Sequence, residues 1–324
     1  MSAPSGAAAA DLAEDVLAGK GRAIGRAITE IELGSAAVPE LLARLFPSTG
    51  RARIIGITGP PGAGKSTLVQ RIAQAFRREG RTVGIVAVDP SSPFTGGAIL
   101  GDRIRMSEIY TDPGVFIRSM ATRGAMGGLA RATPDAVDVL DAAGFEVVLI
   151  ETVGVGQDEV DVVRAADTVA VVLVPGLGDD IQAIKAGILE IADVFVVNKA
   201  ERDGADRAVA ELSMMLDLSG HPEWRAPIVK TSATTGAGVP EAVQALEAHG
   251  AHLRGTAEGA RRRAQRARAR LLALLDVRFR RAVETTAPEA DGLEEATRAV
   301  ASRREDPYSA AARLFERLVR TGRA

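Results

Sequence analysis

The chain has 324 residues, of which 46% are hydrophobic, and a formal net charge of -2. This length allows one large domain with appended segments, and the near-neutral charge argues against a general nucleic-acid-binding protein. The absence of cysteine excludes disulfides, iron–sulfur clusters and thiolate metal sites. We find no run that predicts a membrane-spanning helix and no secretion signal, and we expect a soluble, cytoplasmic protein.

The N-terminal part of the chain changes character at about residue 11. Residues 1–10 are rich in Ala, Gly and Ser and are predicted to be disordered. From Asp11 to Leu45, apolar residues recur at helical spacing, which predicts short helices divided near Gly34 and Val38–Pro39. We assign residues 1–50 to an N-terminal helical extension.

Between Arg51 and about Ala248, short β-branched runs alternate with helical stretches. Continuous apolar runs indicate a mostly parallel sheet covered by helices on both faces, which is an α/β fold. The predicted strands are Ile54–Thr58, Val83–Val88, Val115–Arg118, Val147–Glu151, Val169–Val174, Val194–Asn198 and Ile228–Thr231.

A phosphate-binding motif follows the first predicted strand. Residues 59–66 read Gly-Pro-Pro-Gly-Ala-Gly-Lys-Ser and fit the P-loop pattern G-x-x-x-x-G-K-[ST]. Glycines let several backbone N–H groups converge on one anion, Lys65 can reach the outer phosphates, and Ser66 can offer a hydroxyl to Mg²⁺. A helix predicted from about Thr67 to Arg78 adds its positive N-terminal end. A chance glycine-rich turn is the alternative, but it does not explain the Lys-Ser pair between a strand and a helix. The motif predicts a P-loop NTPase whose nucleotide contacts are Gly59, Pro60, Pro61, Gly62, Ala63, Gly64, Lys65, Ser66 and Thr67.

Two later segments indicate guanine as the base. Asn198-Lys199-Ala200-Glu201 follows a predicted strand and is close to the N-K-x-D element of G proteins. Its carboxylate would accept hydrogen bonds from guanine N1–H and the 2-amino group, a donor pair that adenine lacks. A backbone N–H within Ser232-Ala233-Thr234, after the last predicted strand, would address guanine O6. Because Glu201 stands where Asp is usual, the strictness of guanine selectivity stays open, and an ordinary surface turn is the alternative.

Three acidic residues are candidates for the γ-phosphate side of the site. Asp89 and Glu151 end predicted strands, Asp102 lies in a Gly-Asp-Arg segment, and Gly154 follows Glu151 closely. Carboxylates beside a P-loop can hold Mg²⁺ together with Ser66 and can orient an attacking water. Gly154 could present its N–H to the γ-phosphate. The alternative is that these acids cap helices or turns.

The chain beyond His252 is rich in Arg, Ala and Leu with helical periodicity, interrupted at Pro288 and Pro307. The arginines of segment 261–270 are interpreted as the exposed face of a helix whose apolar side contains the leucines of segment 271–275. A surface for RNA or an acidic partner is the alternative.

Five motifs together resemble one known family. The chain is similar to the MeaB/ArgK G-protein chaperones of methylmalonyl-CoA mutase and related adenosylcobalamin enzymes over residues 51 to 240, and its helical ends suit that family. The motifs are Gly-Pro-Pro-Gly-Ala-Gly-Lys-Ser-Thr (59–67), Val-Asp-Pro-Ser-Ser-Pro (88–93), Gly-Asp-Arg-Ile-Arg-Met (101–106), Arg-Ser-Met-Ala-Thr-Arg-Gly (118–124) and Glu-Thr-Val-Gly-Val-Gly-Gln (151–157).

The resemblance implies a GTPase that gates delivery of adenosylcobalamin to an acyl-CoA mutase, protects that mutase and helps to eject damaged cofactor. It also implies a GTPase domain at residues 51–250 and a homodimer held by a C-terminal arm at residues 251–324. By the same resemblance, Lys65 contacts phosphate, Ser66 contacts Mg²⁺ and Glu201 reads guanine. The implied magnesium and water-positioning set is Asp89, Asp102 and Glu151.

A segment that reports nucleotide state to the mutase is implied at residues 174–185. Within it the resemblance assigns partner contacts to Asp179, Asp180, Gln182 and Lys185, and a plain strand-to-helix connection is the alternative.

Three other P-loop classes compete with this interpretation. A kinase would not need the Asn198–Glu201 and 232–234 base readers. A nickel-type metallochaperone would need Cys or His ligands, and a partitioning ATPase would want an early lysine where Pro60 and Pro61 stand. The identity of the acyl-CoA mutase stays open.

Overall fold

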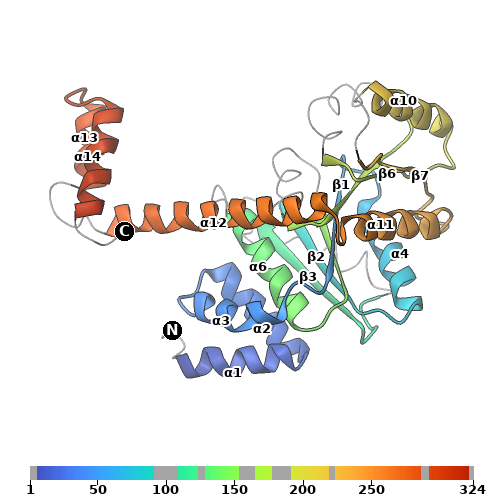
Figure 1. The fold of residues 1–324 in the computed structure, drawn as a ribbon, viewed down its shortest axis with the longest axis horizontal. Coiled ribbons are helices and arrows are strands. Elements are labelled where there is room, and N and C mark those ends of the chain that lie inside the picture. The colour runs from blue at the N-terminus through green and yellow to red at the C-terminus, as the bar shows by residue number, and fades with distance from the viewer. Residues whose placement is uncertain are drawn as a thin grey trace. The chain divides into compact units, whose positions relative to one another are not determined.

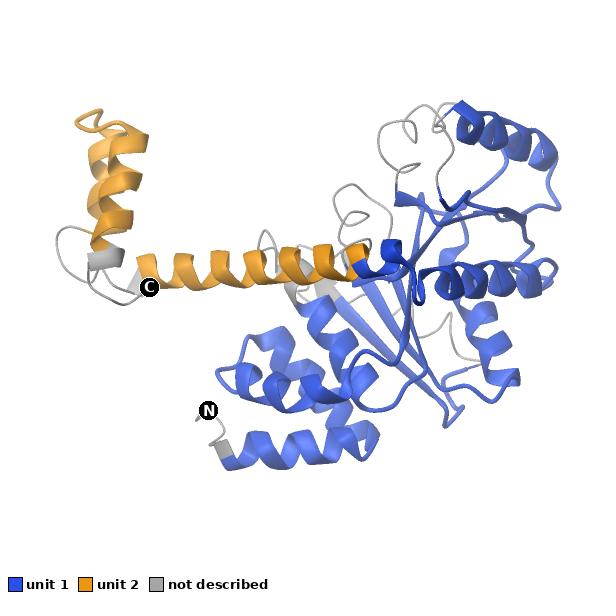
Figure 2. Ribbon diagram, viewed as in Figure 1, with its two compact units in different colours: residues 1–260 blue, residues 261–324 orange. Residues whose placement is uncertain are grey.

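The computed structural model describes residues 6–90, 109–122, 128–152, 165–176, 191–218, 223–285 and 292–320. The chain forms two compact units, Met1–Ala260 and Arg261–Ala324 (Figure 2). No helix among these residues is long and apolar enough to cross a membrane.

The first unit is built on a parallel sheet flanked by helices (Figure 1). Its seven strands lie in the order β3-β2-β4-β1-β5-β6-β7. Every recorded strand pair is parallel, which confirms the predicted α/β class. All seven predicted runs are strands, and β3 extends furthest beyond its predicted end because its pairing with β2 continues to the Pro90–Thr122 register. The strands are β1 (Arg53–Thr58), β2 (Val83–Pro90), β3 (Val115–Thr122), β4 (Val147–Thr152), β5 (Thr168–Leu173), β6 (Val194–Val197) and β7 (Ile228–Lys230).

Both faces of this sheet are buried, which is why the strands read as continuous apolar runs. In β4, Val147 and Leu149 pack in one core cluster with two helices, while Val148 and Ile150 pack in another cluster on the opposite face. A third cluster buries Phe195 of β6 beneath a further helix. The helices are α4 (Lys65–Arg78) and α11 (Val239–Leu253) on the first face, and α2 (Gly21–Leu33), α6 (Gly128–Ala142) and α10 (Ala205–Leu218) on the second.

The N-terminal helices are α1 (Gly6–Leu17), α2, α3 (Val38–Leu45) and the short 3-10 helix η1 (Phe46–Ser48). The prediction of disorder is wrong for residues 6–10, which form the first turns of α1, and residues 1–5 lie outside the described part. Alanine has the best intrinsic helix propensity, and Ala9 is buried against its neighbours. The predicted break at Gly34 is confirmed, since this glycine ends α2 at φ +63°.

The helical segment is fastened to the sheet by Asp141 of α6. Its carboxylate accepts hydrogen bonds from the backbone N–H groups of Gly50 (2.5 Å), Arg51 (3.2 Å) and Ala52 (2.9 Å). A second link is the ion pair between Arg118 of β3 and Glu32 of α2. The N-terminal helices therefore belong to the same compact unit as the sheet.

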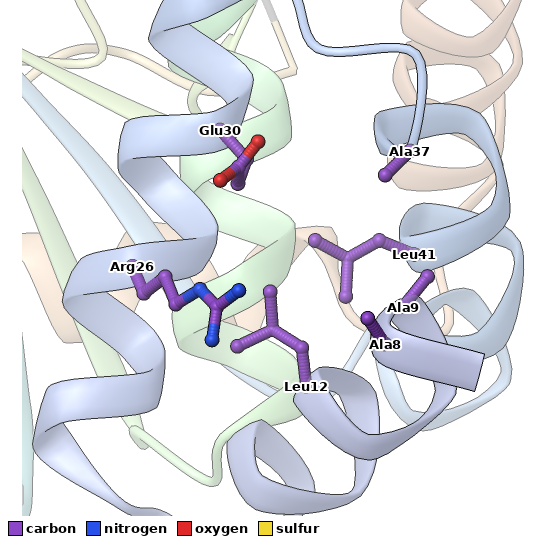
Figure 3. Close-up of a pocket in the computed structure, with 7 residues that line it drawn as sticks. All are labelled: Ala8, Ala9, Leu12, Arg26, Glu30, Ala37 and Leu41. Atoms are coloured by element: carbon purple, nitrogen blue, oxygen red, sulfur yellow. The ribbon is translucent and has the colours of Figure 1, made fainter. Parts of the chain in front are cut away.

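A small apolar depression lies among α1, α2 and α3, with Arg26 and Glu30 at its edge and Leu12 and Leu41 in its wall (Figure 3). Its volume of ≈ 260 Å³ includes open solvent, so the enclosed space is small. It has no P-loop residue in its lining, so the nucleotide site has to be sought at the edge of the sheet.

The C-terminal helices are α12 (Ala257–Thr285), α13 (Leu293–Ala301) and α14 (Pro307–Arg320). Pro307 begins α14 instead of breaking it, as expected for a residue that lacks an N–H. Within the second unit, the rings of Phe279 and Phe315 lie 5.8 Å apart. The α12 side chains Leu271 and Leu275 remain 62% and 60% exposed, although they were predicted to form the apolar side of the helix.

Candidate nucleotide-binding site

The P-loop (residues 59–66) joins the end of β1 to the start of α4. From β1 the chain continues to β2 and β3 on one side of the sheet, whereas β5, β6 and β7 lie on the other side. The carboxyl end of β1 is thus the point where the strand order reverses. Parallel α/β sheets bind their ligands at this position.

Two glycines of the P-loop lie where any side chain would collide with a neighbouring strand end. Gly59 has φ +141°, and a Cβ there would lie 2.1 Å from the carbonyl oxygen of Val172. Gly64 has φ +86°, and a Cβ there would lie 2.5 Å from Nδ2 of Asn198. The loop therefore approaches the ends of β5 and β6 closely, which brings the P-loop near the segment predicted to read the base.

Lys65 is the first residue of α4 and its side chain is buried. Its ammonium donates to the carbonyl oxygens of Gly59 (2.7 Å) and Pro60 (3.0 Å), which fixes the charge inside the curve of the loop. The helix begins two residues earlier than predicted, so Ser66 and Thr67 lie in its first turn, where backbone N–H groups have no intrahelical acceptor. Positive charge and spare N–H donors converge here, as anion binding requires.

Ser66 and Glu151 meet beside the P-loop. The Ser66 hydroxyl donates to Oε1 of Glu151 over 2.6 Å, and Glu151 is buried near the end of β4. The donor set suits Mg²⁺, which prefers oxygen ligands and commonly uses one or two protein groups together with substrate phosphates. Asp89 lies at the end of neighbouring β2, but its side chain is outside the described part, as are Asp102 and Gly154.

On the base side, Asn198 links three segments and is itself buried. Its Nδ2 donates to the carbonyl oxygen of Ala63 at 2.8 Å. Its Oδ1 accepts from the Thr231 hydroxyl at 3.1 Å and from the Ala233 N–H at 3.0 Å. Lys199, at φ +56°, donates from Nζ to the carbonyl oxygen of Gly62 at 2.7 Å. The P-loop and both predicted base-reading segments are therefore in direct contact.

Glu201 is exposed at the end of this segment. Its own backbone N–H lowers the pKa of its carboxyl most, followed by a hydrogen bond from the side chain of Ser232, with Arg202 and Lys199 adding to the effect. The group is consequently a carboxylate at neutral pH. It lies against the base loop (residues 232–234), so the two predicted readers of guanine are adjacent.

Arg71 of α4 is a residue that our motif analysis missed. Its guanidinium donates to the carbonyl oxygens of Ala233 and Thr234 in the base loop. Nothing in the sequence marks it, because the contact joins residues that are 162 and 163 positions apart. The predicted partner contacts Asp179, Asp180, Gln182 and Lys185 lie outside the described residues.

The parallel sheet and the P-loop at its strand-order reversal define a P-loop NTPase. Residues 24–288 match the family model described as "Methylmalonyl Co-A mutase-associated GTPase MeaB". The chain belongs to this MeaB family and is a P-loop GTPase.

Two relatives and one solved structure illustrate the range of similarity. "Putative GTPase PH0274" of Pyrococcus horikoshii is 48% identical over 313 residues, which cover 95% of this chain and 98% of the relative. The mitochondrial "Methylmalonic aciduria type A homolog" of Mus musculus is 40% identical over 192 residues, 58% of this chain and 46% of the relative. The crystal structure named "LAO/AO transport system kinase" has a TM-score of 0.69 at 24% identity and covers 97% of this chain and 99% of that one. This last likeness shows the fold alone.

Proposed function

We propose that this GTPase is a chaperone for an adenosylcobalamin-dependent acyl-CoA mutase. GTP hydrolysis would gate cofactor delivery to the mutase, protect the mutase during turnover and help to eject damaged cofactor. The observation that carries the proposal is the family match over residues 24–288, whose description names association with methylmalonyl-CoA mutase. The name of the mouse relative supports the same client class. We place this activity in the cytoplasm.

Within the site, we assign phosphate binding to the P-loop and Lys65. Ser66 and Glu151, which already share a hydrogen bond, would hold Mg²⁺ with Asp89 and Asp102. When bound, Mg²⁺ would neutralise charge on the β- and γ-phosphates. Glu151 also stands at a strand end where a carboxylate can orient an attacking water. Gly154 would contact the γ-phosphate.

Guanine recognition is assigned to Glu201 and to a backbone N–H of the base loop. The lowered pKa of Glu201 supports this role, because only the ionised carboxylate can accept from both guanine donors. These base readers also count against the alternative, a P-loop kinase acting on a small molecule or a protein. The loop at residues 174–185, with Asp179, Asp180, Gln182 and Lys185, would transmit nucleotide state to the mutase.

The client can be tested by a panel of purified holo-mutases that use methylmalonyl-, isobutyryl-, ethylmalonyl- or hydroxyisobutyryl-CoA. Each is mixed with this protein and either GDP or a non-hydrolysable GTP analogue, and complexes are separated by size-exclusion chromatography. One mutase should co-elute. In a separate assay with GTP, loading of the apo form of that mutase from free adenosylcobalamin should depend on GTP hydrolysis. A GTPase that binds none of the four in either nucleotide state contradicts the proposal.

We further propose that the protein is a homodimer through segment 251–324. The support is the exposed apolar face of α12, where Leu271 and Leu275 are more than half exposed within the chain. Leu275→Glu should yield monomers in light scattering. Ala273→Glu places the same charge on the opposite side of the same helix and should leave dimers intact. Equal behaviour of the two variants would contradict the arm as the dimer contact.

A further inference from the structure

We propose that Arg71 is a positioning residue that aims the base loop at guanine without touching the nucleotide itself. The inference rests on the proposed function, in that residues 232–234 are taken to read the base. It adds to the site a residue from α4, the helix that otherwise serves phosphate binding.

The contact is a fork between one guanidinium and two successive carbonyl groups. Nε of Arg71 donates to the oxygen of Ala233 at 3.1 Å, and Nη2 donates to the oxygen of Thr234 at 3.3 Å. Nη1 donates to Oε1 of Gln74 at 3.0 Å, one turn further along α4, which holds the guanidinium in plane. Arginine is suited to such a contact because its donors are fixed in one plane.

Holding a carbonyl oxygen also fixes the N–H of the following residue. The peptide group is planar and trans, so the C=O of Ala233 and the N–H of Thr234 point in opposite directions. When Arg71 draws the two carbonyl oxygens toward α4, the N–H groups of Thr234 and Thr235 are turned away from α4. The direction of the donors in this loop is therefore set from the α4 side.

The opposite side of the same loop is held by Asn198, whose Oδ1 accepts from the Ala233 N–H. Asn198 in turn donates to Ala63 of the P-loop, and α4 begins where the P-loop ends. These contacts close a ring that runs from the P-loop through Asn198, the base loop and Arg71 to α4. Phosphate and base recognition are thus built on one connected frame.

Local bonds keep the turn itself formed without Arg71. The Ser232 N–H donates to the oxygen of Ala237 at 2.9 Å, and the Gly236 N–H donates to the oxygen of Ser232 at 2.8 Å. Removal of the guanidinium should therefore free the backbone N–H groups of the base loop to change direction, while the turn itself stays formed. This separates a positioning role from a merely structural one.

The test compares affinities of the full-length protein for GDP, IDP and ADP by calorimetry. IDP keeps the O6 and N1–H of guanine but lacks the 2-amino group. In Arg71→Gln, the affinities for GDP and IDP should both fall about tenfold, as expected for lost charge-assisted hydrogen bonds. The affinity for ADP should not change. Arg71→Lys should recover part of the loss, and Arg78→Gln, an exposed arginine on the same helix, should resemble the parent.

Two results overturn different claims. An unchanged ratio of GDP to ADP affinity in Arg71→Gln overturns the positioning role, whether no nucleotide loses affinity or all three lose it equally. A parent protein that binds ADP as tightly as GDP instead overturns the guanine assignment of the proposed function. Thermal unfolding of each variant shows whether the fold persists during the measurement.

Discussion

The two halves of the proposed site differ in composition. The proposed phosphate half consists mainly of backbone, namely the glycines of the P-loop and the first turn of α4. The proposed base half depends on side chains from separate segments that contact the base loop, above all Asn198, Glu201 and Arg71. A short contiguous sequence motif is enough to specify the P-loop backbone. The arrangement of side chains around the base loop depends on how elements distant in the sequence pack together.

The halves are nevertheless coupled through direct contacts. Asn198 and Lys199 donate to carbonyl oxygens of Ala63 and Gly62, so base-side residues help to hold the phosphate loop. Substitutions of Asn198 or Lys199 should consequently affect both phosphate and base recognition, but to different degrees.

The largest effect is expected from Lys65→Ala in the phosphate half. Loss of a preorganised charge next to the transferred phosphoryl group lowers turnover by about 10²–10³-fold or more, and we expect no measurable GTP hydrolysis. Phosphate release is the assay, and circular dichroism with thermal unfolding serves as the folding control. A folded variant that turns over GTP at the parent rate would remove the P-loop from the reaction.

Gly59→Ala probes how closely the cradle approaches the sheet. Its Cβ would lie 2.1 Å from the Val172 oxygen at a strained φ of +141°, so backbone must move. Gly62→Ala is the matched control, since it also has positive φ (+74°) but open space around the new Cβ. We expect a loss of about 2–4 kcal/mol in unfolding free energy at Gly59 and about 1 kcal/mol at Gly62, measured by urea denaturation. Equal losses would show that only φ matters.

Asn198→Ala tests the coupling between the halves. The substitution removes the buried hydrogen-bond partner that the Ala63 oxygen, the Thr231 hydroxyl and the Ala233 N–H share. We expect the free energy of unfolding to fall by about 1–3 kcal/mol. GDP affinity should fall together with stability. The neighbouring Lys199→Ala should cost less, because its bond to Gly62 is exposed to solvent. A larger loss at Lys199 than at Asn198 would contradict Asn198 as the central link.

The sequence predicts the strands and the position of the P-loop well, and it predicts the contacts around Asn198 only in part. The seven strands and the P-loop follow from local patterns: β-branched runs, glycine spacing and a lysine before a helix. The Asn198–Glu201 segment was also found, because it resembles a known base reader. Its bonds to Ala63 and Ala233 were not foreseen, since they depend on the lateral order of β1, β6 and β7.

Two failures have clear physical causes. Residues 6–10 were predicted to be disordered from their small-residue composition, yet Ala9 can be buried in a helix at little entropic cost. Arg71 was missed because an arginine on an amphipathic helix has no sequence signature of its target. Composition indicates only the average tendency of a segment. The helix at residues 6–10 and the contact of Arg71 both depend on which surface the helix packs against.

The smallest effect is expected from Glu201→Asp in the base half. The shorter side chain restores the residue usual at this position, so the preference for GDP over ADP should stay the same or sharpen.

The pKa of Glu201 is lowered, so its ionised form, which guanine needs, should persist as the pH falls from about 8 to about 5. The ratio of GDP to ADP affinity, measured by calorimetry, should be level across this interval, because both nucleotides carry the same titrating diphosphate. This ratio should decline only in stronger acid, as the pH passes through the lowered pKa. Glu201→Gln cannot accept from both guanine donors and should lose the preference at every pH. A steep decline of the parent's ratio of GDP to ADP affinity between pH 7 and pH 6 would contradict Glu201 as the base-reading carboxylate.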